Sequence, residues 1–197
     1  MVLLGVSLPP LGLLYGLHVG FDIPYTHLTR DVLALAHLPP YTGFLSNFGL
    51  LVWGSTAAIC LFESARLSGP WHWTSLKAFL RYAGLFTLLL TLDDWYLVHE
   101  EIFPYLHIPE KLMYAFYAAT APLFMAACWR VIARSDYWVL AVALGLLAVS
   151  IGIDQVEIDW FIWASLLEDL AKFVGICAWA VYFVWLAWRG DAAPPKP

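Results

Sequence analysis

Apolar residues along the chain come in blocks long enough to cross a lipid bilayer, separated by short polar connections. A membrane-spanning helix needs about 20 predominantly apolar residues, so this chain accommodates about six. The predicted spans are residues 2–19, 41–62, 78–98, 109–129, 137–153 and 165–188. We therefore predict an all-α integral membrane protein. It forms a single bundle of about six transmembrane helices over residues 1–189, followed by a disordered tail at residues 190–197.

Prolines modify this pattern at two of the predicted helices. Pro9 and Pro10 predict a kink or break in the first block, and Pro109 suits the first turn of the fourth. No Lys or Arg precedes the first block, so we expect a retained helix and not a cleaved signal. In the connection that follows, residues 29–37 favour a short helix at the membrane interface.

Composition supports the membrane class. Hydrophobic residues make up 62% of the chain and charged residues 13%, whereas soluble domains average about 45–50% and about 25%. No basic patch suggests nucleic acid as a partner. The three cysteines, Cys60, Cys128 and Cys177, lie in apolar blocks and lack C-x-x-C spacing. We therefore expect them to be small apolar packing residues.

The basic residues predict the orientation. Short cytoplasmic loops carry an excess of Lys and Arg. If six spans alternate, seven of the ten basic residues fall on one side: Arg66, Lys77, Arg81, Arg130, Arg134, Arg189 and Lys196. Twelve of the fifteen acidic residues fall in the other half. Both termini are therefore predicted to be cytoplasmic.

The third predicted helix carries the most informative polar residues. Asp93 lies about 18 Å along the helix from Arg81, which places Asp93 and Asp94 well inside a bilayer core about 30 Å thick. A carboxylate there costs about 2.5–3.5 kcal/mol and by default marks a functional site. On a regular helix His99 points about 120° away from Asp93, so that one helix is not expected to present both to the same ligand.

Other predicted helices bring similar groups to the same level of the membrane. Glu168 and Asp169 stand one turn before Lys172 in the last span, and a pair between one of them and Lys172 is the simpler structural alternative. Asp93, Asp94 and His99 are the candidate catalytic groups, and Lys172 and Glu168 are the candidate cofactor-binding groups. The candidate metal ligands are Asp93, Asp94, His99, Glu100, Glu168 and Asp169.

Three classes of function remain open. Carboxylate and imidazole ligands suit Zn, Mn or Fe, and a metal at the membrane face activates water for hydrolysis or transfer on a lipid. The paired histidines of alkaline-ceramidase-type hydrolases, H-x-x-x-H, are absent from the sequence. Alternatively, the same residues relay a proton or cation in a transporter. Thirdly, they lock helices together in a non-enzymatic subunit of a larger membrane complex. Metal or cation binding is the leading hypothesis.

Three strings resemble those of an uncharacterised group of multi-pass bacterial membrane proteins with the patterns L-D-D-x4-H-E, P-E and L-E-[DE]-x-A-K. The matching residues are Leu92 to Glu100, Pro109-Glu110 and Leu167 to Lys172. The resemblance covers roughly residues 79–185 and implies a shared helical bundle in the bacterial inner membrane, with no activity attached. It also implies one common site for Asp93, Asp94, His99, Glu100, Glu110, Glu168, Asp169 and Lys172.

Overall fold

The computed structural model describes residues 2–68, 72, 74–109, 111–155 and 161–190, except for the side chains of residues 2–6, 100, 161 and 162. All regular structure in these residues is helical. The chain divides into two compact units, Met1–Phe44 and Leu45–Pro197. The single bundle over residues 1–189 stays a prediction. The predicted tail lies, from residue 191 onward, outside the described residues.

The first unit contains one long and two short helices. Helix α1 (Val2–Phe21) continues through Pro9 and Pro10, so the prolines do not end it. Helices α2 (Tyr25–Thr29) and α3 (Val32–Leu35) follow, and α3 is the short helix expected within residues 29–37. The Asp31 side chain caps the N-terminus of α3 by accepting hydrogen bonds from the backbone N–H groups of Leu33 and Ala34.

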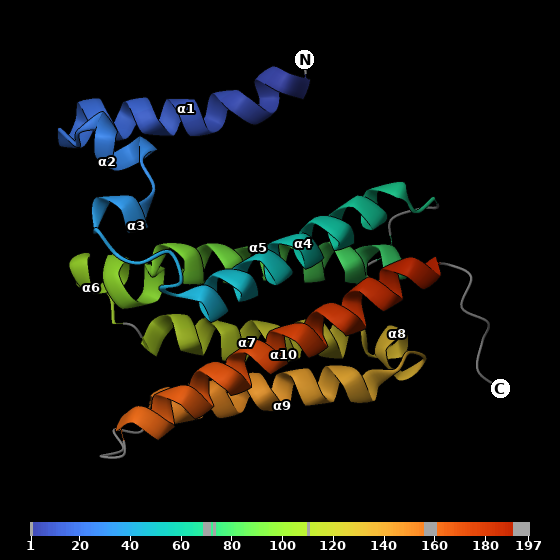
Figure 1. The fold of residues 1–197 in the computed structure, drawn as a ribbon. Helices are drawn as coiled ribbons and strands as arrows, with labels where there is room; N and C mark the ends of the chain where they lie inside the picture. The colour runs from blue at the N-terminus through green and yellow to red at the C-terminus, as the bar shows by residue number, and fades with distance from the viewer. Residues whose placement is uncertain (1, 69–71, 73, 110, 156–160, 191–197) are drawn as a thin grey trace. The chain divides into compact units, whose positions relative to one another are not determined.

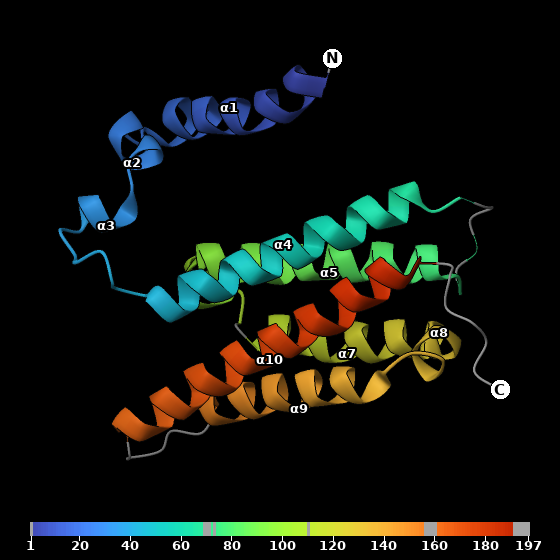
Figure 2. The same cartoon turned by 45° about the vertical axis from the view of Figure 1, so that its right-hand side comes forward.

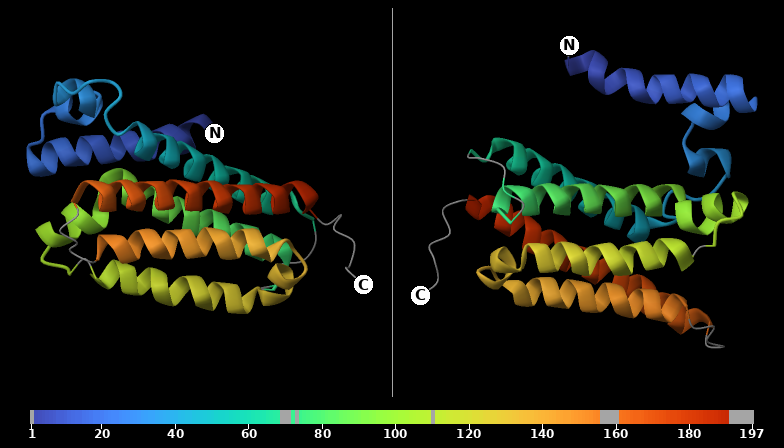
Figure 3. Two further views of the ribbon diagram at one scale, coloured as in Figure 1. Left: turned by 60° about the horizontal axis from the view of Figure 1, so that its bottom comes forward. Right: turned by 180° about the vertical axis from the view of Figure 1, so that it is seen from behind.

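The second unit is built from long helices that lie side by side (Figures 1 and 2). These are α4 (Phe44–Arg66), α5 (Leu76–Tyr96), α7 (Lys111–Ala127), α9 (Tyr137–Asp154) and α10 (Phe161–Arg189). Helix α10 packs along α9 (Figure 3). Short pieces connect the long helices: the π-helix η1 (Val98–Ile102), α6 (Phe103–Tyr105) and α8 (Trp129–Ala133).

Local sequence explains the beginning of α5. Ser75 begins α5 by accepting a hydrogen bond from the Ala78 N–H at 3.2 Å. The predicted fourth block, residues 109–129, ends earlier as α7 because the chain turns at Cys128 before α8. Pro122 lies inside α7.

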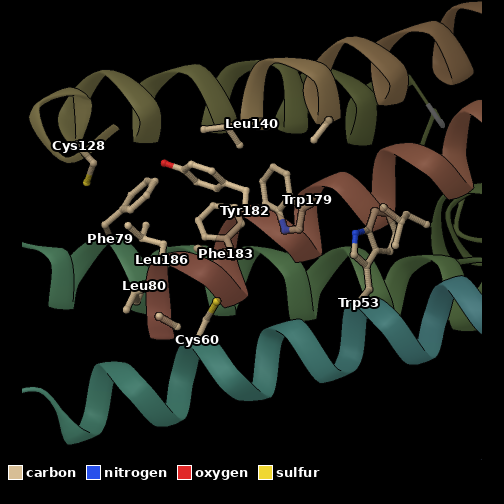
Figure 4. Packing of buried hydrophobic residues seen from close by; sticks show 14 of the residues in the cluster. Trp53, Cys60, Phe79, Leu80, Cys128, Leu140, Trp179, Tyr182, Phe183 and Leu186 are labelled. Carbon is tan, nitrogen blue, oxygen red and sulfur yellow. The ribbon is translucent and has the colours of Figure 1, made fainter. Parts of the chain in front are cut away.

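An aromatic core joins α5 to α10. Phe79 and Phe183 are fully buried with ring centroids 5.5 Å apart, and Trp179 packs 4.7 Å from Phe183 (Figure 4). The Trp179 indole N–H is satisfied because it donates to Thr87 Oγ1 at 2.9 Å. Cys60 and Cys128 are buried free thiols, in agreement with a packing role.

Small residues allow close helix approach. At Gly84 of α5, an added Cβ would lie 2.7 Å from Leu61 Cγ of α4. At Gly175 of α10, it would lie 3.0 Å from Leu147 Cγ of α9. Close backbone approach at small residues is the usual way in which helices pack in a membrane.

Three of the described helical segments are long and apolar enough to cross a membrane: Phe44–Arg66, Tyr137–Asp154 and Trp163–Arg189. Helix α7 is shorter, with 17 residues. Helix α5 has 21 residues but also carries Lys77, Arg81, Asp93 and Asp94.

Candidate functional site

The backbone beyond α5 brings His99 to Asp93. Helix α5 ends at Tyr96, Leu97 adopts a left-handed conformation with φ of 50°, and the π-helix η1 begins at Val98. Asp93 Oδ1 accepts a hydrogen bond from the His99 N–H at 3.1 Å. Asp93 Oδ2 lies 2.8 Å from His99 Nδ1. The expectation that His99 points away from Asp93 is therefore wrong, because it assumed a regular helix through Leu97.

Helix α7 contributes a phenol to the same carboxylate. Tyr117 donates its hydroxyl hydrogen to Asp93 Oδ2 at 2.8 Å. One turn earlier Tyr114 places its ring against the His99 ring, with centroids 5.3 Å apart, and donates to Asp154 Oδ2 of α9 at 3.0 Å. The sequence analysis missed both tyrosines. Their spacing of three residues on one helical face was the available signal, although tyrosine in an apolar block is common near membrane interfaces.

Asp94 pairs with a different helix. The Lys172 ammonium of α10 donates to Asp94 Oδ1, which joins α5 to α10 across 78 residues of sequence. The Asp94 side chain is 10% exposed and that of Lys172 is 34% exposed. Adjacent carboxylates on α5 thus have different partners: Asp93 contacts His99 and α7, whereas Asp94 contacts α10.

We call this set of side chains the polar network: Asp93, Asp94, His99, Tyr117 and Lys172. Its carboxylates are nearly buried and engaged by donors: an amide N–H, a phenol and an ammonium group. Buried carboxylates require such partners because an unpaired charge is costly to bury. Chemically, the network supplies hydrogen-bond donors to both acids, pairs Asp94 with a cation, and ties α5 to α7 and α10.

The remaining predicted residues lie on α10 beside Lys172 or outside the described part. Asp169 is exposed on α10 and lines a small cavity of about 30 Å³ together with Ser46, Asp94 and Lys172. Glu168, its neighbour, is half-buried. Glu110 and the Glu100 side chain lie outside the described residues.

The described geometry does not confirm the predicted metal centre. A metal site requires at least three ligand atoms that converge on one point. Among the side chains that the structure describes, no group of three or more His, Cys, Asp or Glu residues is arranged in that way. The candidate ligands Asp93 and His99 instead contact each other, and Asp94 contacts Lys172.

Comparison with known proteins identifies a family but no activity. No curated protein and no solved structure matches the chain. A family model does match, over residues 1–186, and this span includes every residue of the polar network. The chain therefore belongs to the family described as a domain of unknown function, DUF8692.

Proposed function

We propose that the chain is a multi-pass protein of the bacterial inner membrane, with six spans formed by α1, α4, α5, α7, α9 and α10 and with both termini in the cytoplasm. The three segments with the length and composition of a span support this proposal. Large apolar side chains also remain exposed along the long helices of the second unit, among them Leu51, Phe62, Leu85, Leu123 and Val142. Soluble proteins rarely expose so many, whereas a lipid bilayer covers them.

The partners within the bundle support a membrane position for α5 despite its charges. Polar groups in lipid must be satisfied inside the protein. Thr91 donates to the Thr87 carbonyl at 2.7 Å, and both Asp93 and Asp94 have donors. Arg81 and Lys77 stand at the opposite end of the helix, at the level of the cytoplasmic interface in this orientation.

Reporter fusions test this topology. A fluorescent protein fused after residue 197 or residue 68 is expected to fluoresce, because it folds in the cytoplasm. Alkaline phosphatase fused after residue 107 or residue 155 is expected to be active, because it folds outside. The reverse pattern at any of these four positions contradicts the six-span topology.

Within this membrane bundle, the polar network acts as an interhelical lock, and the protein is a non-enzymatic subunit or scaffold. The observation that carries this role is the pairing of Lys172 with Asp94. It neutralises the lysine and one of the two adjacent acids and joins helices distant in sequence. A buried polar pair of this kind fixes which helix faces meet, even where an apolar pair would be as stable.

Variants of the ion pair test the lock. Removing one partner of a fully buried pair costs about 3–5 kcal/mol, and of an exposed pair about 0–1 kcal/mol. Lys172 is one-third exposed, so we expect Asp94→Asn or Lys172→Gln to cost about 1–3 kcal/mol between these limits. The assay is thermal unfolding of the detergent-purified protein. Glu101→Gln is the control, because Glu101 is an exposed acid in the neighbouring η1.

The exchanged pair gives the sharper result. The double variant Asp94→Lys with Lys172→Asp restores opposite charges, so it is expected to be more stable than either single charge reversal. Additive losses in the double variant, or single variants as stable as Glu101→Gln, would falsify the lock.

A small cation site is the second candidate function. The cavity of about 30 Å³ beside Asp94, Asp169, Lys172 and Ser46 supports it. This volume is about that of one water molecule. Two carboxylates and a hydroxyl are oxygen ligands that hard cations accept. A metal held there would also supply the water activation that the hydrolysis or transfer of a lipid requires.

Elemental analysis distinguishes the two candidates. The wild type is compared with Asp169→Asn, and with His99→Ala as a variant outside the cavity, after incubation with Mg, Ca, Mn, Zn or Fe. Near-stoichiometric metal in the wild type that is lost in Asp169→Asn supports the cation site. No bound metal, together with destabilised Asp94→Asn, leaves the lock as the function.

A further inference from the structure

A large open groove lies at the end of the second unit opposite the polar network. Its volume is about 1230 Å³, and its lining comes from α8, the first turn of α9, the last turns of α10 and the start of α5. In the proposed orientation this end is cytoplasmic. The groove shares no residue with the polar network.

The polar part of the groove is positively charged. Arg130, Arg134 and Arg189 line it, and Asp136 is the acidic side chain among the described lining residues. Arg189 Nη1 lies 3.4 Å from Asp136 Oδ2, and Arg189 Cζ lies over the Trp185 ring, 4.7 Å from its centroid. Within the described chain, no acidic side chain lies within ion-pair distance of Arg130 or Arg134, and both arginines are exposed. An anion that enters the groove therefore meets two exposed guanidinium groups.

The remaining walls are apolar. Val139 of α9 faces the groove together with Val181, Val184 and Trp185 of α10. Val181 is 61% exposed and Trp185 is 48% exposed. On α10, these side chains precede Arg189 by one to two turns, toward the centre of the proposed span. The groove therefore combines an anion-binding end with a wall suited to hydrocarbon.

The polar floor is already satisfied. The Ser135 hydroxyl donates a hydrogen bond to the Ile132 carbonyl oxygen at 2.7 Å. The Tyr182 hydroxyl lies within hydrogen-bond distance of Ser135 Oγ, at 2.8 Å. These groups need no ligand, so recognition rests on the arginines. A guanidinium group is well suited to phosphate, because its planar donors bind two phosphate oxygens together.

We propose that this groove binds an anionic glycerophospholipid of the cytoplasmic leaflet. The lipid phosphate lies against Arg130 and Arg134, and one acyl chain lies along Val139, Val181 and Trp185. Basic pockets between transmembrane helices on the cytoplasmic side commonly bind anionic headgroups. This inference rests on the proposed membrane position, but it is independent of the lock.

Native mass spectrometry of the detergent-purified protein tests the proposal. Phosphatidylglycerol and phosphatidylcholine with the same acyl chains are added in parallel. We expect retained phosphatidylglycerol in the wild type and a loss of affinity of about tenfold or more in Arg130→Gln/Arg134→Gln, because charge-assisted bonds to phosphate are lost. Arg81→Gln is the control. It removes one positive charge from the proposed cytoplasmic end of α5, at a residue that does not line the groove.

A second variant and a competition experiment test the proposal if the arginine variant does not fold. Val181→Trp fills the apolar wall without changing charge, and it is expected to displace phosphatidylglycerol as well. Inorganic phosphate is expected not to compete at equal concentration, because it lacks the acyl chain. Equal retention of the two lipids by the wild type overturns the proposal, as does unchanged retention of phosphatidylglycerol in the Val181 variant.

The failure of this proposal is distinguishable from the failure of the lock. Asp94→Asn changes the opposite end of the unit, so it is expected to leave lipid retention unchanged while it lowers thermal stability. If Asp94→Asn is as stable as the wild type but lipid selectivity persists, the lock is wrong and the lipid-binding proposal is retained.

Discussion

Gly84 provides a direct test of how closely α4 and α5 pack. An alanine Cβ at this position would lie 2.7 Å from Leu61 Cγ and 3.1 Å from the Ala57 carbonyl oxygen. Leu61 Cγ is a branch point and the carbonyl belongs to the backbone, so neither moves as easily as the end of a flexible side chain. To accept Gly84→Ala, the Leu61 side chain must change its conformation or the two helices must separate.

The magnitude follows from two opposing terms. Replacing glycine by alanine inside a helix gains about 0.8–1.0 kcal/mol of helix propensity. Overpacking a tight contact costs about 1–3 kcal/mol. Gly145 of α9 is the matched control, because nothing lies within 4 Å of its added Cβ. Gly145→Ala keeps only the favourable term, so the difference between the variants isolates the steric cost of about 1–3 kcal/mol.

Thermal unfolding in detergent measures this difference. For a chain of this size, 1 kcal/mol corresponds to about 2–4 °C in melting temperature. We expect Gly84→Ala to melt below Gly145→Ala by a few degrees or more. Equal melting temperatures for the two variants would refute the close α4–α5 contact.

Two further predictions concern hydrogen bonds between helices. Thr87→Val leaves the Trp179 indole N–H without its acceptor and is expected to cost about 1–3 kcal/mol in thermal unfolding, whereas Thr87→Ser is expected to recover most of the loss. Tyr117→Phe removes a donor to Asp93 and is expected to cost about 1–2 kcal/mol, with Tyr105→Phe, at an exposed tyrosine, as the unaffected control. An unfolding temperature of Thr87→Val equal to that of Thr87→Ser, or of Tyr117→Phe equal to that of Tyr105→Phe, would contradict the corresponding hydrogen bond.

The hydrophobic pattern predicted the helices because length and apolar composition are local properties of the sequence. The predicted block at residues 137–153 is α9, Tyr137–Asp154. The ends were less predictable where tertiary structure sets them. The last helix begins at Phe161, before the predicted residue 165, and the fourth block turns at Cys128.

The candidate site was predictable where a charge had to be paired. Asp94 and Lys172 are charged residues within predicted apolar spans, and each therefore required a partner inside the protein. The choice of partner was not predictable, since Glu168 and Asp169 stand at suitable helical spacing from Lys172. Only the packing of α5 against α10 brings Asp94 to the lysine.

The contact between His99 and Asp93 depended on a backbone feature without a sequence signal. Left-handed residues are usually glycine or asparagine, but here Leu97 takes that conformation. A π-helix follows, and such turns occur frequently at functional sites. Reading η1 as a continuation of a regular helix therefore placed His99 on the wrong face.

Helix α10 connects the two proposed sites and constrains what passes between them. Lys172 and Arg189 are 17 residues apart, which corresponds to about 26 Å of helix and approaches the thickness of a bilayer core. Between them α10 carries no acidic or basic side chain, and its inner face packs Ile176, Trp179 and Phe183 into the apolar core. An ion moving from the polar network to the groove would have to cross this packed layer without a charged partner, at the large cost of burying an unpaired charge. In the proposed membrane orientation, the arrangement therefore favours two separate sites, one near each end of α10, over a transport path along this helix.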